Sequence, residues 1–138
     1  MNLKRWVMAT LGAFGVIAIG DTVIHRCWLG AFYRANPQWW RPVEQMQSLV
    51  SVMVASELFL AAILVFIYAK GYENGKGTLG QGFRFGLLMG LLLLVPALLM
   101  KHVVYPYPVA LLFNWFIGGL IQIVLTGIMI GYLYKPAK

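Results

Sequence analysis

Four long apolar stretches dominate this 138-residue chain, and they limit its possible folds more than any other feature. They cover about residues 6–25, 47–69, 81–104 and 109–134. A helix that crosses the hydrocarbon core of a bilayer needs about 20 apolar residues, so each stretch is long enough. The chain has only four acidic and eleven basic residues, whereas a soluble domain is typically about a quarter charged. We therefore predict an all-α integral membrane protein, a four-helix transmembrane bundle that forms one domain over residues 1–138.

The connection between the first two stretches is aromatic and basic. Its sequence, RCWLGAFYRANPQWWRPVEQ, sets Trp, Tyr and Phe among three arginines. Aromatic and basic residues concentrate together at the boundary between membrane and water. Asn36-Pro37 indicates a turn, and Pro42 suits the first turn of the following helix. We expect an amphipathic loop that lies on the membrane surface between the first two helices.

Basic residues at the ends of the stretches predict the orientation. With the N-terminus inside, seven of them fall on the inner side and four on the outer side. The cytoplasmic side carries the excess of Lys and Arg, so both termini are expected in the cytoplasm, beneath a bacterial inner membrane. Contacts with lipid head groups then account for the net charge of +7, without nucleic-acid binding. The inner set is Lys4, Arg5, Lys70, Lys76, Arg84, Lys135 and Lys138, and the outer set is Arg26, Arg34, Arg41 and Lys101.

Glycines recur every fourth residue in the third stretch, at Gly82, Gly86 and Gly90. Small residues at this spacing let two helix backbones approach closely in a bilayer, which promotes helix association. Gly127 and Gly131 repeat the spacing in the fourth stretch. We expect these glycines to mediate self-association or assembly into a larger membrane complex.

The fourth stretch carries two stripes on different faces of its helix. They predict two contacts, one through glycines against a neighbouring backbone and one that presents amides to the bundle interior. Asn and Gln in membrane helices commonly form hydrogen bonds across helices. Alternatively, the amides line a polar site shared with buried acids. The polar stripe is Asn114, Gly118, Gln122 and Thr126, and the glycine stripe is Gly119, Ile123, Gly127 and Gly131.

Two of the four acidic residues, Asp21 and Glu57, fall within the apolar stretches. Burying an ionisable group in a membrane is expensive, so both are candidate functional residues. Glu57 lies roughly 15 Å below the outer end of the second stretch, at 1.5 Å per residue. It is either a site for a proton, a cation or a ligand, or a neutral carboxyl that ties two helices together. Lys101 is a candidate cation that would neutralise Asp21 or Glu57.

The two histidines, His25 and His102, lie near the outer ends of the first and third stretches. Asp21 and His25 are four residues apart, so they share a helix face on which the carboxylate can fix the tautomer of the ring. Two histidines on different helices are also the axial ligands that a haem iron accepts. A single cysteine and so few other ligands indicate neither a disulfide nor a metal site. The sequence therefore predicts no cofactor, and haem is the alternative that the two histidines leave open.

From Lys70 onward the chain contains two segments with regularly spaced glycines, KGYENGKGTLGQGFRFGLLMG and LLFNWFIGGLIQIVLTGIMIGYLY. With these segments the second half of the chain resembles small four-span bacterial membrane proteins of uncharacterised function. It implies a multi-pass membrane protein, but no activity and no functional residue.

The leading functional hypothesis is a non-catalytic membrane protein that acts through helix packing, as an accessory subunit or a homo-oligomer. One alternative is a small proton-coupled transporter that uses Glu57, with Asp21 assisting. Another is a haem- or quinone-binding membrane subunit that uses His25 and His102. The sequence contains no nucleophile elbow, phosphate-binding loop or metalloprotease motif, so we predict no catalytic residue and disfavour an enzyme.

Overall fold

The computed structural model describes residues 3–134, which are helical apart from turns and short connections. Four of the helical segments are long and apolar enough to cross a membrane, as expected for a multi-pass membrane protein. They are α1 (Leu3–Thr22) with the π-helical turn Val23–Trp28 that continues it, α4 (Val50–Lys70), α5 (Thr78–Val104) and α6 (Val109–Leu133). The predicted all-α fold with four long helices is therefore confirmed.

Four of the predicted helix boundaries differ from the structure by three residues: the starts of the first, second and third helices and the end of the first. The first helical segment continues to Trp28, because the chain widens into a π turn at Val23 instead of ending. The second long helix begins at Val50, because the residues before it form a separate short helix, α3 (Val43–Ser48). The predicted amphipathic loop contains two further short elements, α2 (Gly30–Ala35) and a 3-10 turn (Pro37–Trp39).

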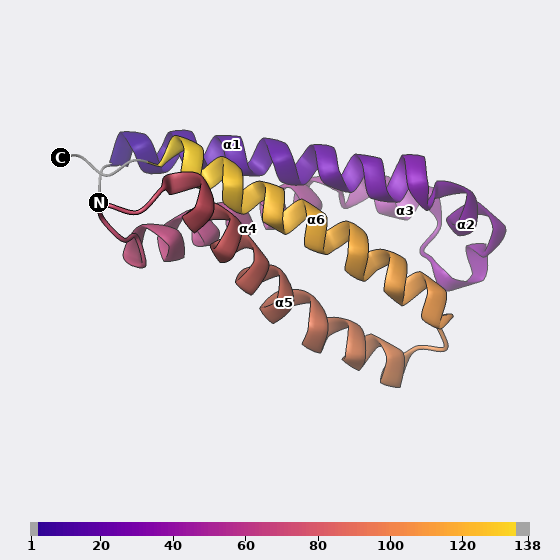
Figure 1. The fold of residues 1–138 in the computed structure, drawn as a ribbon. Coiled ribbons are helices and arrows are strands. Elements are labelled where there is room, and N and C mark those ends of the chain that lie inside the picture. Colours follow the sequence, from indigo (N-terminus) through magenta and orange to yellow (C-terminus); the bar gives the residue numbers. More distant parts are fainter. Residues whose placement is uncertain (1–2, 135–138) are drawn as a thin grey trace.

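The long helices pack in the order α4, α1, α6, α5. Helix α1 contacts both α4 and α6, and α5 makes its extensive contact with α6 alone. The start of α1, the end of α6 and the α4–α5 loop lie at one end of the molecule, which we call the terminal end (Figure 1). Helix α2 and the α5–α6 connection lie at the opposite end, the aromatic end (Figure 1). Lys135 and Lys138, which belong to the predicted inner set, lie outside the described residues.

The glycine stripes of α5 and α6 pack against each other within one chain. A Cβ atom at Gly82 would lie 2.4 Å from the carbonyl oxygen of Gly127, and one at Gly86 would lie 2.7 Å from that of Ile123. Only glycine permits this approach, because the opposing atoms belong to rigid helix backbone. We expected these glycines to mediate association with another chain. The contact within the chain already covers them, so an association would need a different surface.

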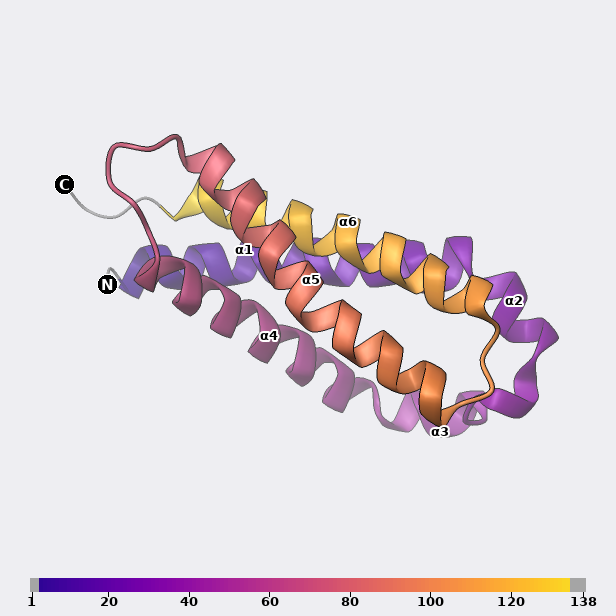
Figure 2. The same cartoon turned by 60° about the horizontal axis from the view of Figure 1, so that its bottom comes forward.

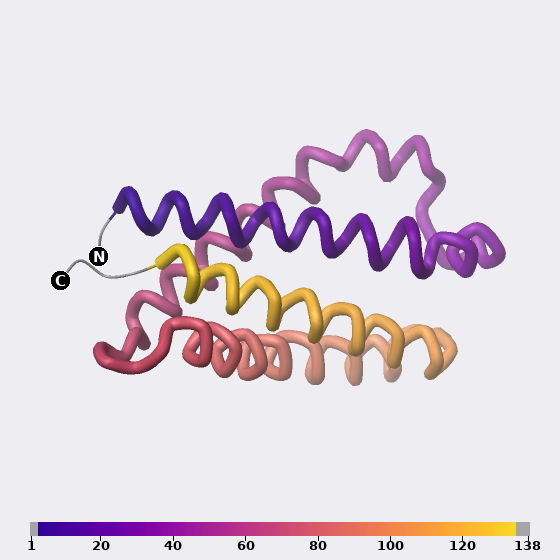
Figure 3. The backbone as a smooth tube through the Cα atoms, turned by 45° about the horizontal axis from the view of Figure 1, so that its top comes forward, coloured from indigo at the N-terminus to yellow at the C-terminus, as the bar shows by residue number. Residues whose placement is uncertain are grey.

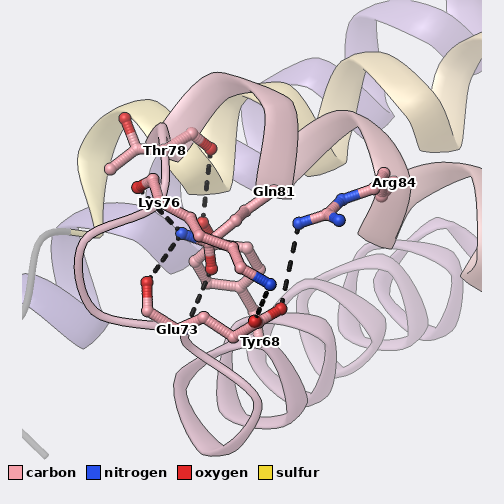
Figure 4. Close-up of polar contacts among 6 residues, drawn as sticks. All are labelled: Tyr68, Glu73, Lys76, Thr78, Gln81 and Arg84. Carbon is pink, nitrogen blue, oxygen red and sulfur yellow. Dashed lines mark hydrogen bonds and ion pairs between the residues drawn. The ribbon is translucent and has the colours of Figure 1, made fainter.

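The α4–α5 loop is held by a buried amide, Gln81, at the start of α5. Its side-chain oxygen accepts from the Glu73 backbone N–H at 2.9 Å, and its nitrogen donates to the backbone oxygens of Glu73 and Lys76 at 2.9 and 3.0 Å (Figure 4). The Glu73 carboxylate pairs with Lys76 and, at 3.8 Å, with Arg84 (Figure 4). The hydrogen bond from Lys76, followed by the charges of Lys76 and Arg84, holds the pKa of Glu73 below its ordinary value.

Burial divides α4 and α5 into a packed half and an exposed half. On α4, burial begins at Glu57 and recurs to Tyr68, whereas residues 50–56 are all exposed. On α5, the buried residues run from Gln81 to Gly90, and none of residues 91–104 is buried. The two helices diverge from the loop that joins them, and α4 crosses behind α1 on its way to α3 (Figure 3). Helix α1 also lies beside α6 along most of their length in the second view (Figure 2). Glu57 is therefore the first buried residue of α4, and the helix before it lies outside the packed part of the bundle.

Candidate functional site

The two acidic residues of the apolar helices meet inside the bundle. Asp21 lies in the last turn of α1 and Glu57 in the second turn of α4, and their side chains form a hydrogen-bonded carboxyl pair. Glu57 is only 8% exposed, although all seven α4 residues before it, 50–56, are exposed. The pair thus sits where α1 and α4 pack together, at the border between the packed and exposed halves.

A third helix contributes an amide to this pair. The Gln122 side-chain nitrogen, on α6, donates to the Asp21 carboxylate at 2.9 Å and to the Ile17 backbone oxygen at 2.8 Å. Gly20 makes room for the amide, because a Cβ there would lie 2.7 Å from Gln122 Cγ. Thr126, fully buried one turn further along α6, donates its hydroxyl to the Gln122 backbone oxygen at 2.8 Å. We call Asp21, Glu57 and Gln122 the carboxyl site.

Among the described residues no lysine or arginine pairs with the carboxyl site, although the His25 ring lies within electrostatic range of Asp21. Lys101 was a candidate cation for Asp21 or Glu57, but the structure places its ammonium against Trp115. The Lys101 ammonium lies over the Trp115 ring, 4.9 Å from its centroid, and the described residues show no ion pair from it to Asp21 or Glu57. The indole face attracts the cation, and α5 makes its main contact with α6 rather than with α1 or α4. In the described part of the chain the acids are therefore met by hydrogen bonds and not by an ion pair to Lys101.

His25 lies four residues beyond Asp21 toward the aromatic end, within the π turn. Its Nδ1 atom is 2.7 Å from the Tyr33 hydroxyl, and the Trp115 indole N–H donates to the same hydroxyl at 2.7 Å. Both Asp21 and Lys101 act on the ring electrostatically. Burial raises the pKa of Tyr33 above its ordinary value, although the bond from Trp115 opposes the rise, so its hydroxyl keeps its proton at neutral pH. We call His25, Tyr33 and Trp115 the imidazole cluster.

Aromatic rings close the bundle next to the imidazole cluster. Trp40 stacks on Tyr107 with ring centroids 5.6 Å apart and meets the edges of Tyr33 and Trp115 at 4.9 and 6.2 Å. These contacts join the amphipathic loop to the α5–α6 connection and to α6. They fix the position of the Tyr33 hydroxyl relative to α1.

Besides Lys101, two more predicted site residues stay outside both groups. Asn114 is on the same α6 stripe as Gln122 but roughly two turns nearer the aromatic end, too far to share its partners. His102 is exposed near the C-terminal end of α5, and no contact in the described residues joins it to His25. Among the described residues there is also no group of three or more side chains that suits a metal ion.

Sequence reasoning did not identify Gly20, Tyr33 or Trp115 as part of a site. Gly20 precedes Asp21 directly, and a small residue beside a buried acid is a usable signal for a close neighbour. Tyr33 and Trp115 are 82 residues apart in the chain, so only the tertiary structure shows that they share a hydrogen bond.

The chemistry of the carboxyl site follows from its two acids. Two carboxyl groups in contact do not readily ionise together, since their like charges repel, so the pair binds and releases protons as a unit. An amide nitrogen on Asp21 supports a negative charge there, because a charged acceptor strengthens a hydrogen bond. The arrangement can hold a proton between two helices inside the membrane.

Comparisons with known proteins assign no relative. No family model matches the chain, and searches of the curated proteins and of the solved structures likewise returned no match.

Proposed function

We propose that the protein is a small membrane protein whose conformation is coupled to proton binding, as in a proton-coupled transporter. The observation that carries this proposal is the contact between Asp21 and Glu57, with Gln122 as its neutral partner and no lysine or arginine paired with it among the described residues. A purely structural tie between helices needs one hydrogen-bonding group on each side. It does not need two ionisable acids buried together, which are costly in a membrane.

The position of the pair suggests how a proton would act on the fold. Helix α4 is enclosed from Glu57 onward and exposed before it. Two unit charges 4 Å apart repel by about 4 kcal/mol at an effective permittivity of 20. Repulsion of that size changes a two-state equilibrium by about three orders of magnitude, so loss of the shared proton favours movement of α4 away from α1.

The proposal is tested with two spin labels at exposed positions, Val52 on α4 and Ile121 on α6, after Cys27→Ser removes the native thiol. The distance between the labels is measured in lipid nanodiscs across a pH titration. We expect it to change with pH in the parent protein and to become independent of pH in Asp21→Asn and Glu57→Gln. Glu44→Gln, which removes an exposed acid outside the site, is the matched control.

Two results would overturn the proposal. One is a distance that does not respond to pH in the parent protein. The other is a response that survives both substitutions. Either result, with the variants folded, would favour the non-catalytic hypothesis, in which the protein acts through helix packing alone.

We also propose that the protein resides in a bacterial inner membrane with its terminal end in the cytoplasm. Its support is the distribution of basic residues: the described part of the terminal end carries Lys4, Arg5, Lys70, Lys76 and Arg84. Single cysteines at Gln38 and Asn74, in the Cys27→Ser background, test it with a membrane-impermeant maleimide on intact cells. Only the Gln38 position should be labelled, and labelling of Asn74 alone would reverse the orientation.

A further inference from the structure

We infer that His25 is the residue through which the carboxyl site exchanges protons with water at the aromatic end, held in place by Tyr33 and Trp115. The inference rests on the proposed function, since it supplies a proton route to the same pair of acids. It concerns a different group of residues, the imidazole cluster.

The backbone places His25 between the carboxyl site and the surface. The ring is exposed, and it lies about one turn from Asp21 on the same helical segment. The π turn begins at Val23 and is closed by the bond from the Leu29 N–H to the Ile24 oxygen, at 2.8 Å. A π turn holds more residues than an α turn, so side chains four apart lie more nearly in line along its axis. His25 is thereby kept on the Asp21 side of the helix.

Tyr33 and Trp115 control which ring nitrogen exchanges protons. An indole N–H can only donate, and both nitrogens of a protonated histidine can only donate. When His25 is protonated, its Nδ1–H and the Trp115 indole N–H therefore both donate to the Tyr33 oxygen, each at 2.7 Å. The Nδ1 atom is occupied by this bond, which leaves Nε2 to exchange protons. Tyr33 itself is a positioning residue, because its raised pKa keeps it from giving up its own proton.

The charged groups around the ring come from three elements. Asp21 precedes it on α1 and favours its positive charge, and Lys101 on α5 opposes that charge. Glu57 on α4 lies behind Asp21 as its hydrogen-bonded partner. Helix α6 contributes the neutral Trp115 indole.

The transfer balances without any other reactant. A hydronium ion at the surface gives a proton to Nε2, which leaves water and an imidazolium. The Nε2–H bond then breaks and an O–H bond forms on the Asp21 carboxylate, which leaves neutral imidazole with Nδ1–H still bonded to Tyr33. The proton is then shared with Glu57.

The experiment follows the carboxyl groups by time-resolved infrared spectroscopy of the full-length protein in nanodiscs, after light releases protons from a caged acid. The carboxyl band is assigned by its loss in Asp21→Asn and Glu57→Gln. We expect His25→Ala to slow protonation of the pair by about 100-fold, the low end of what a positioned acid–base group contributes. Tyr33→Phe should give a smaller slowing, and His102→Ala, the matched control at an exposed histidine, should give none.

Added imidazole should restore the rate in His25→Ala, because the exposed position leaves room for it, and it should not accelerate the parent protein. Protonation of His25→Ala at the parent rate would overturn the inference. So would a slowing that imidazole does not reverse, since it would report a change in structure and not a lost proton carrier. If the parent protein shows no titrating carboxyl band, the proposed function itself is refuted. A titrating band with an unchanged rate in His25→Ala refutes only the role of His25.

Discussion

The carboxyl site depends on the absence of a side chain at Gly20, and Gly20→Ala tests that dependence. The added Cβ would lie 2.7, 2.9 and 3.1 Å from Cγ, Cδ and Nε2 of Gln122. Because Gln122 is buried and bonded at both of its contacts, the amide must leave Asp21 or Ile17 to make room. Gly15→Ala is the matched control on the same helix, since a Cβ at Gly15 meets no atom within 4 Å.

The size of the effect follows from the two bonds. A hydrogen bond between membrane helices contributes about 0.6 kcal/mol on average and up to about 1.7, and a bond to a charged group contributes about 1.5–3 kcal/mol. The gain in helix propensity from Gly to Ala, about 1 kcal/mol in water, is common to both variants and cancels between them. Because one of the two bonds is lost, Gly20→Ala should be less stable than Gly15→Ala by about 1–3 kcal/mol.

Reversible unfolding in mixed detergent micelles measures the difference in free energy of unfolding, and infrared spectroscopy records the carboxyl band of the same samples. We expect Gly20→Ala to lose stability and to shift the band of the carboxyl pair, whereas Gly15→Ala should leave the band unchanged. Equal stability of the two variants with the same band position would refute the argument that Gln122 supports the site.

Three further predictions concern the terminal end. Gly82→Ala should destabilise the fold by about 1–3 kcal/mol in the same unfolding assay, because its Cβ would meet the backbone of α6, whereas Gly80→Ala, in open space, should not. Gln81→Ala should speed amide hydrogen exchange in the α4–α5 loop, since three hydrogen bonds are lost, and Asn74→Ala, exposed in the same loop, should have little effect. The lowered pKa of Glu73 means that its ion pairs stabilise the loop above its unfolded pKa, about 4.3, and are lost as the pH falls through its folded value. Loop exchange, corrected for its intrinsic pH dependence, should rise on acidification and lose this rise in Glu73→Gln.

The sequence predicted the helices and the use of the α6 faces because both depend on local patterns. The glycine stripe contacts α5, as at Gly127, and Gln122 on the polar stripe contacts α1. These two contacts were predicted from residues spaced four apart, since such residues share a helix face. The glycines pack within the chain, and the predicted association with another chain stays a prediction.

From the sequence, Asp21 and Glu57 could be predicted to lie in the same half of the bundle, but not to contact each other. Asp21 was expected near the end of its helix, but the π turn extends the helical segment to Trp28, which places Asp21 roughly 10 Å from that end. No local pattern in the sequence predicted this extension. Asp21 is bonded by Gln122 and not by Asn114, and Lys101 lies over Trp115 and not beside an acid. Both outcomes depend on which helices pack together.

The central claim is that Asp21 and Glu57 bind protons as one unit. An infrared pH titration of the carboxyl bands tests it most directly, in the parent protein, Asp21→Asn and Glu57→Gln. We predict two separate protonation steps in the parent protein and one step in each variant, at a pH that matches neither parental step, because each variant removes the interaction between the acids. A parental titration equal to the sum of the two single variants would show independent carboxyls and would contradict the claim.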